Sequence, residues 1–223
     1  MLSREQIAKY IDHTLLKPVA TFEDIEKLCS EAVEYGFYSV CVNSCYVKYA
    51  VSKLQGTDVK VAATVGFPLG ASAGETKAFE AAGAIKDGAV EVDMVINVGF
   101  LKSGDYYAVT RDIESVVKAV KEINPDAKVK AILEMGYLTP GEKVTACKLA
   151  KDAGADFVKT STGFGGGGAT VEDIKLMKKM VGDSMGIKAS GGIRDLATLL
   201  AMLDAGATRI GTSSGVAIMQ EVK

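Results

Sequence analysis

The sequence contains few of the residues that build metal centres or disulfide frameworks. It has no tryptophan, one histidine (His13), and four cysteines, Cys29, Cys41, Cys45 and Cys147. Three residues separate Cys41 from Cys45, but the second ligand pair that a zinc site would require does not follow. We therefore expect reduced cysteines in the core and no bound metal.

Long apolar runs and a strong charge imbalance are also missing. No run approaches membrane-spanning length, and residues 1–6 lack the apolar segment of a signal peptide, so we expect a cytoplasmic protein. The net charge of −2 argues against nucleic acid or an anionic membrane as the main partner. The hydrophobic share of 48% and charged share of 24% are ordinary, and we assign residues 1–223 to one large domain.

Predicted strands and helices alternate along the whole chain. We expect strands at 11–16, 38–42, 60–65, 90–96, 129–134 and 209–211, and in two short runs around Lys159 and Lys188. We expect helices at 3–10, 21–35, 44–54, 74–87, 105–122, 140–153, 170–181 and 194–205. Eight strands in strict alternation with helices, without a linker, predict an α/β fold: a single (β/α)8 TIM barrel with a short N-terminal helix.

Two lysines stand at the ends of short apolar runs that have the composition of buried strands. Lys159 and Lys188 are each followed within a few residues by glycines. Buried lysines are rare, because the ammonium loses its hydration. If both lysines face one cavity, each destabilises the charged form of the other, and a nucleophilic amine needs the lowered pKa that results. Together with Asp93, near the end of another strand, they are the predicted catalytic residues.

Other charged residues also lie within the expected strands. Alternation places Glu91 on the same face as Asp93, and Glu134 on the same face as Lys130. Barrel active sites lie at the C-terminal ends of the strands, whereas charges deeper in a barrel can be structural ion pairs. We interpret Glu91 as structural, and a structural or a functional role stays open for Lys130 and Glu134.

The glycine-rich segment 163–168 matches the G-x-G-x-x-G pattern of dinucleotide sites. The next strand, however, does not end in the acidic residue that would bind a ribose, and four consecutive glycines fit almost any glycine pattern. Phosphate is the better ligand, because barrels often bind it with the loops after strands seven and eight. The residues expected at this phosphate site are Gly191, Gly192, Arg194, Gly211, Ser213 and Ser214.

Seven stretches together make the chain similar to the deoxyribose-phosphate aldolase family. They are 11–18, 39–43, 66–70, 91–97, 157–163, 187–194 and 209–214, so the resemblance covers nearly the whole chain. Its most specific part is the Lys-Thr-Ser-Thr-Gly motif at 159–163 combined with the motif around Lys188. The resemblance implies a class I aldolase, without metal or cofactor, that reversibly cleaves 2-deoxy-D-ribose 5-phosphate to D-glyceraldehyde 3-phosphate and acetaldehyde.

The resemblance also implies roles for individual residues. Lys159 would form the Schiff base, Lys188 would be the cation that keeps Lys159 partly unprotonated, and Asp93 would transfer protons through water. The substrate pocket would be lined by Asp12, Cys41, Thr162 and Gly163.

Two alternatives stay open at this point. One is another phosphosugar barrel enzyme, either a Schiff-base enzyme or an isomerase. The other is a phosphosugar-binding protein without catalytic activity. The expected partners are small molecules, a phosphosugar and an aldehyde, and a homo-dimer or homo-tetramer is compatible with the sequence.

Overall fold

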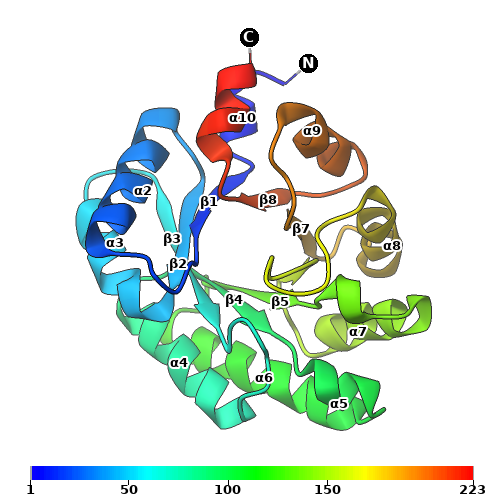
Figure 1. Ribbon diagram of the computed structural model, residues 1–223. Helices are drawn as coiled ribbons and strands as arrows, with labels where there is room; N and C mark the ends of the chain where they lie inside the picture. Colours follow the sequence, from blue (N-terminus) through cyan, green and yellow to red (C-terminus); the bar gives the residue numbers. More distant parts are fainter. Residues whose placement is uncertain (1, 223) are drawn as a thin grey trace.

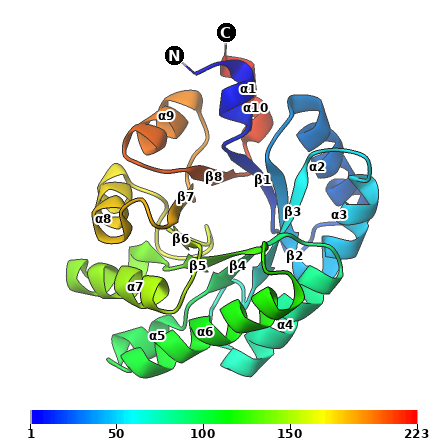
Figure 2. The same cartoon turned by 180° about the vertical axis from the view of Figure 1, so that it is seen from behind.

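The computed structural model describes residues 2–222 and contains a closed barrel of eight parallel strands in sequence order (Figures 1 and 2). The strands are β1 (Ile11–Leu15), β2 (Ser39–Asn43), β3 (Lys60–Val65), β4 (Glu91–Val95), β5 (Lys128–Ile132), β6 (Phe157–Lys159), β7 (Gly186–Ser190) and β8 (Arg209–Thr212). β8 pairs with β1 and closes the barrel, with Ile210 opposite Ile11. The predicted (β/α)8 barrel is confirmed.

Helices surround the barrel because each parallel pair of strands needs a crossover connection (Figure 1). They are α1 (Arg4–Ala8), α2 (Phe22–Tyr35), α3 (Val47–Lys53), α4 (Gly74–Lys86), α5 (Val98–Lys102), α6 (Tyr106–Ile123), α7 (Pro140–Asp152), α8 (Val171–Val181), α9 (Leu196–Asp204) and α10 (Gly215–Glu221), with 3-10 turns η1 (Ser44–Tyr46) and η2 (Met135–Tyr137). Within residues 2–222, none of the helices has both the length and the apolar character needed to cross a membrane.

Local signals in the sequence explain where several helices begin and end. The side chain of Thr21 accepts a hydrogen bond from the backbone N–H of Asp24, and Asp24 reciprocates, so the predicted capping box starts α2. Gly36 ends the same helix in the left-handed conformation, with φ 69°. Ser3 and Gln6 form the capping box predicted for the N-terminal helix.

The two faces of each strand have different environments. In β4, Val92 and Met94 belong to the apolar layer between strands and helices, whereas Glu91 and Asp93 point into the barrel and form ion pairs there. The apolar layer thus holds the barrel together from outside and leaves the interior free for polar groups. This division positions the candidate site.

The structure corrects one sequence-based interpretation and adds two helices. β5 ends at Ile132, and Glu134 has the left-handed φ of 54°, so Glu134 does not share a strand face with Lys130 as predicted. The reason is a long-range contact: the Glu134 carboxylate accepts hydrogen bonds from Thr162 in the loop after β6. The short helices α5 and α10 were not predicted; the side chain of Asn97 starts α5 by accepting from Phe100 N–H.

Candidate active site

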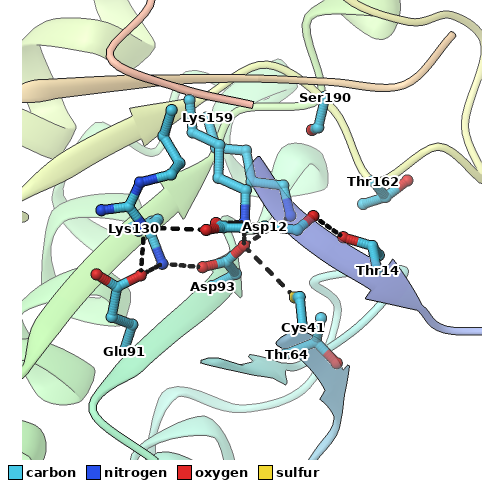
Figure 3. Close-up of polar contacts among 12 residues, drawn as sticks. Asp12, Thr14, Cys41, Thr64, Glu91, Asp93, Lys130, Lys159, Thr162 and Ser190 are labelled. Carbon is cyan, nitrogen blue, oxygen red and sulfur yellow. Dashed lines mark hydrogen bonds and ion pairs between the residues drawn. The ribbon is translucent and has the colours of Figure 1, made fainter. Parts of the chain in front are cut away.

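Seven charged residues meet inside the barrel, and each of these residues is at most 6% exposed. Six of them form a closed ring of alternating charge, which we call the charge ring, through ion pairs with N–O distances of 2.5–3.0 Å. The order around the charge ring is Asp12, Lys188, Asp93, Lys130, Glu91, Arg209 and back to Asp12. The seventh side chain, Lys159, is attached to the charge ring through Asp93 (Figure 3).

Asp93 is the junction between Lys159 and the charge ring. Its Oδ1 accepts a hydrogen bond from Lys130 Nζ at 2.7 Å, and its Oδ2 accepts from Lys159 Nζ at 2.8 Å and from Lys188 Nζ at 2.7 Å. Burial alone would raise the pKa of Asp93, but the three lysines outweigh burial and hold that pKa well below its usual value. Asp93 is therefore a carboxylate throughout the physiological pH range.

Lys159 and Lys188 contact the same oxygen of Asp93, but their pKa values are shifted in opposite directions. Burial and the charge of Lys188 lower the pKa of Lys159, against the attraction of Asp93. Burial would also lower the pKa of Lys188, but Asp12, at 2.5 Å, and Asp93 raise it above its ordinary value. The geometry thus provides one amine with a lowered pKa beside one permanent cation, which is the pair that amine catalysis requires.

A cavity of about 300 Å³ opens at the C-terminal ends of the strands, and Lys159 forms part of its wall. The predicted site residues that line this cavity are Lys159, Thr162, Gly163, Gly191, Gly192, Arg194, Gly211 and Ser213. Active sites of this fold lie at this end of the barrel. The loops after β6, β7 and β8 therefore meet around one cavity.

Five predicted residues do not line this cavity, and four of them lie in or beside the charge ring. Asp12, Asp93 and Lys188 are buried in the charge ring beneath the cavity, and Cys41 lies beside them, with its thiol donating to Asp93 Oδ2 at 3.9 Å (Figure 3). Burial raises the pKa of Cys41, so its thiol stays protonated. Among these four side chains, Asp93 is the one that contacts Lys159, and Lys188 and Cys41 contact Asp93.

Ser214, predicted to bind phosphate, does not line the cavity. Its backbone N–H donates to Thr212 Oγ1 at 2.9 Å, which fixes the turn between β8 and α10. Thr212 itself lines the cavity, as do Thr14, Lys17 and Ser190, which the sequence did not single out. Lys17 is the only one of these four with a charge, and its place just before Pro18 at the start of a βα loop was a usable signal.

Glu134 holds the loop that follows Lys159. Its carboxylate accepts a hydrogen bond from the Thr162 hydroxyl and another from the Thr162 backbone N–H at 3.3 Å. The Thr162 hydroxyl in turn accepts from Phe164 N–H at 3.0 Å. A left-handed conformation is unusual for glutamate, and such strain often marks a functional position.

The glycine tract serves close packing between loops. A side chain at Gly168 would place its Cβ 2.4 Å from the carbonyl oxygen of Gly191, and a Cβ at Gly165 would lie 2.8 Å from the Glu134 carboxyl carbon. Ala169 N–H donates to the same Gly191 oxygen at 2.9 Å. These glycines are thus needed for the close contacts of the β6 loop with the β7 loop and with Glu134, which accounts for them without a dinucleotide.

No group of three or more His, Cys, Asp or Glu side chains within residues 2–222 is arranged to hold a metal ion. The charged groups that the structure brings together beneath the cavity are amines, a guanidinium group and carboxylates. A (β/α)8 barrel with a low-pKa lysine at its cavity and a second lysine beside it defines a class: barrel enzymes that react with carbonyl groups through a lysine amine.

The chain belongs to the DeoC/LacD aldolase family, whose model matches residues 6–221. It is 64% identical over 216 residues to a deoxyribose-phosphate aldolase of Thermococcus gammatolerans, covering 96% of this chain and 95% of the relative. It is 63% identical to a protein of the same name from a Thermoanaerobacter strain, covering 96% of each chain. The solved structure of the deoxyribose-phosphate aldolase from Aeropyrum pernix, described as tetrameric, superposes with a TM-score of 0.91 at 36% identity, covering 98% of this chain and 91% of that one.

Proposed function

We propose that the chain catalyses the reversible cleavage of 2-deoxy-D-ribose 5-phosphate to D-glyceraldehyde 3-phosphate and acetaldehyde through a Schiff base on Lys159. The family membership and the names of its relatives support the reaction. The observation that carries the mechanism is the position of the Lys159 amine, which lines the cavity and shares the Oδ2 atom of Asp93 with Lys188. The activity is that of a lyase that cleaves a carbon–carbon bond.

The reaction begins when the neutral amine of Lys159 attacks the aldehyde carbon of the open-chain sugar. Uptake of a proton and loss of water give a protonated imine, which withdraws electrons from the neighbouring carbon. Removal of the proton from the C3 hydroxyl then breaks the C2–C3 bond, releases D-glyceraldehyde 3-phosphate and leaves an enamine on Lys159. Protonation of the enamine carbon and hydrolysis release acetaldehyde and restore the amine.

Asp93 and Lys188 act together in these proton transfers. Because its pKa is held low, Asp93 is a weak base by itself, and we infer that it works through a water molecule that it holds beside the reacting carbon. Lys188 keeps its proton and its charge, so it favours the neutral form of Lys159. Asp12 fixes Lys188 from the opposite side, at 2.5 Å.

The phosphate of the substrate would bind at the far end of the cavity from the charge ring. The loops after β7 and β8 offer backbone N–H groups at Gly192 and Ser213, and Arg194 is exposed beside them. A guanidinium group and backbone N–H donors are the usual ligands of a phosphate. Lys17, on the same cavity wall, adds a second positive charge.

The decisive experiment traps the imine. The protein is incubated with acetaldehyde and cyanoborohydride, and the modified residue is located by peptide mass spectrometry. We expect one reduced adduct, on Lys159, which Lys159→Ala abolishes, while the exposed-lysine control Lys148→Ala keeps it. An adduct on a different residue, or none in the wild-type protein, contradicts the proposal and favours the isomerase or the binding protein.

Four further expectations stay predictions. A homo-oligomer is supported by the tetrameric relative from Aeropyrum pernix, and size-exclusion chromatography with light scattering would test it. The assignment of residues 1–223 to one domain and a cytoplasmic location follow from the sequence-based arguments above. The small net charge of −2 supports the absence of a nucleic-acid partner.

A further inference from the structure

Arg209 and Glu91 close the charge ring at a distance from the reacting amine. Arg209 begins β8, and its Nη1 donates to Asp12 Oδ1 at 3.0 Å and to Glu91 Oε2 at 2.9 Å. The guanidinium carbon lies 3.5 Å from the centre of the Tyr38 phenol ring, and Tyr38 donates its hydroxyl proton to Glu91 at 3.3 Å. Neither Arg209 nor Glu91 lines the cavity, so neither touches the substrate.

We propose that Arg209 and Glu91 are positioning residues for the reaction: by closing the charge ring they balance its charges internally and leave Lys159 as the one base of the cluster without a counter-charge of its own. This inference rests on the proposed function, because it assigns the residues that keep the Schiff-base amine neutral. It goes beyond the effect of Lys188 on the pKa of Lys159, since it assigns the lowered pKa to the charge balance of the whole charge ring.

The contacts of the four basic groups carry the argument. Lys130 contacts Glu91 and Asp93, Lys188 contacts Asp12 and Asp93, and Arg209 contacts Asp12 and Glu91. Among the described residues, Lys159 contacts a single carboxylate, through an oxygen that it shares with Lys188. Three carboxylates thus each bridge two fixed cations, and their charges are balanced before Lys159 is counted.

A buried net charge is costly, because the low-dielectric interior replaces hydration only when charges are paired. Protonation of Lys159 would give the cluster four positive and three negative charges. The group with the fewest carboxylate contacts loses its proton most easily, and that group is Lys159. Consistent with this, the carboxylates raise the pKa of Lys130, Lys188 and Arg209 despite burial, whereas the pKa of Lys159 is lowered.

The remaining titratable groups near Lys159 do not alter this balance. Cys41 on β2 stays protonated because burial raises the pKa of its thiol. Tyr38 donates its hydroxyl hydrogen bond to Glu91 at 3.3 Å and makes none to Lys159 among the described residues. Glu134, beyond the end of β5, directs its carboxylate to Thr162 and makes no ion pair with the charge ring among the described residues.

Charge-changing variants test the proposal by the sign of their effects. The rate of imine formation with acetaldehyde is measured over a pH series, by trapping with cyanoborohydride and intact-mass analysis, and yields the apparent pKa of Lys159. Arg209→Met removes a fixed cation, so Lys159 should take up its proton more readily, and the apparent pKa should rise by about one unit, a tenfold loss of rate at fixed pH. Glu91→Gln removes a carboxylate and should lower the apparent pKa by a similar amount.

Two further variants separate charge from packing. The double variant Arg209→Met/Glu91→Gln restores the balance and should return the apparent pKa close to the wild-type value, although both side chains have changed. Arg209→Lys keeps the charge and should keep the apparent pKa. Near-ultraviolet circular dichroism checks that each variant is folded, and if Arg209→Met does not fold, Glu91→Gln and the double variant decide.

The proposal is overturned if the two single variants shift the apparent pKa of Lys159 in the same direction, or if neither shifts it. It is also overturned if the apparent pKa of the double variant stays different from the wild-type value. These outcomes can be distinguished from a failure of the proposed function. If wild-type protein forms no adduct on Lys159, the aldolase mechanism itself is wrong. If wild-type protein forms the adduct and the variants keep its pH dependence, only the role of Arg209 and Glu91 is wrong.

Discussion

Replacing Lys188 with methionine should raise the pKa of Lys159 by about two units. Lys159 Nζ and Lys188 Nζ lie 2.8 and 2.7 Å from the same oxygen of Asp93, so the two nitrogens are less than about 6 Å apart. At about 5 Å and an effective dielectric constant of about 20, two like charges repel by about 3 kcal/mol. Since 1.36 kcal/mol corresponds to about one pKa unit, removing this repulsion shifts the pKa of Lys159 by about two units.

The assay is the pH dependence of imine formation with acetaldehyde under single-turnover conditions. At a fixed pH below the wild-type pKa of Lys159, Lys188→Met should form the imine about a hundredfold more slowly, and the rate should recover at a pH about two units higher. Turnover of deoxyribose 5-phosphate should fall further, because the variant also loses a partner in proton transfer.

A matched control is the buried lysine Lys77, which pairs with Asp112 at 2.6 Å between α4 and α6, outside the barrel. Lys77→Met leaves a buried carboxylate unpaired and should cost about 3–5 kcal/mol of unfolding free energy, yet it should keep the pH dependence of imine formation. A wild-type pH profile in Lys188→Met, or the same shift in both variants, would refute the electrostatic reasoning.

Four other predictions follow from the same contacts. Asp93→Asn should slow hydrogen exchange at the methyl group of bound acetaldehyde by about a hundredfold, as followed by NMR in deuterated buffer, and wild-type exchange would remove its proton-transfer role. Glu134→Gln weakens the contact that holds Thr162, so KM for deoxyribose 5-phosphate should rise by about tenfold while trapping of acetaldehyde is unchanged. Arg194→Gln should likewise raise KM for the phosphorylated sugar by about tenfold, and an unchanged KM would place the phosphate elsewhere. The pKa of Asp12 is lowered from 3.8 to about 2, because the charges of Lys188 and Arg209 outweigh burial. Ionised Asp12 therefore contributes about 2 kcal/mol to the free energy of unfolding above pH 4. Urea titrations should show that this contribution is lost as the pH falls from about 4 to 2.

The barrel itself could be predicted from the sequence because its signals are local. Strand and helix periodicity, capping boxes and glycines after helices depend on residues a few positions apart. Prediction from local signals fails at Glu134. The alternation of side chains assigns Glu134 to a strand, but its hydrogen bond with Thr162, 28 positions later, holds it beyond the end of β5. The short helices α5 and α10 lacked the length that makes a periodic pattern visible.

Only those site residues that carry a local signal in the sequence could be singled out from it. Lys159, Lys188 and Asp93 stand out because a charge at the end of an apolar strand is costly and therefore informative. Arg209 gave no such signal, because a charged residue at the start of a strand is usually exposed. Glu91 was interpreted as a structural ion-pair partner, and its contacts agree, but only the closed barrel reveals that this ion pair belongs to a ring that includes Asp93 and Lys188.

The charge ring is better explained by chemistry than by stability. Buried ion networks are commonly neutral or destabilising relative to well-packed apolar residues, and most barrels of this fold fill their interior with branched aliphatic side chains. Here six buried charges occupy that space, and among the described residues Lys159 is the cavity-lining side chain with which they form an ion pair. A barrel repacked with aliphatic residues at these positions would fold at least as well. The pKa of Lys159 would then be lowered by burial alone, without the charge of Lys188 and without the Asp93 carboxylate that orients the amine.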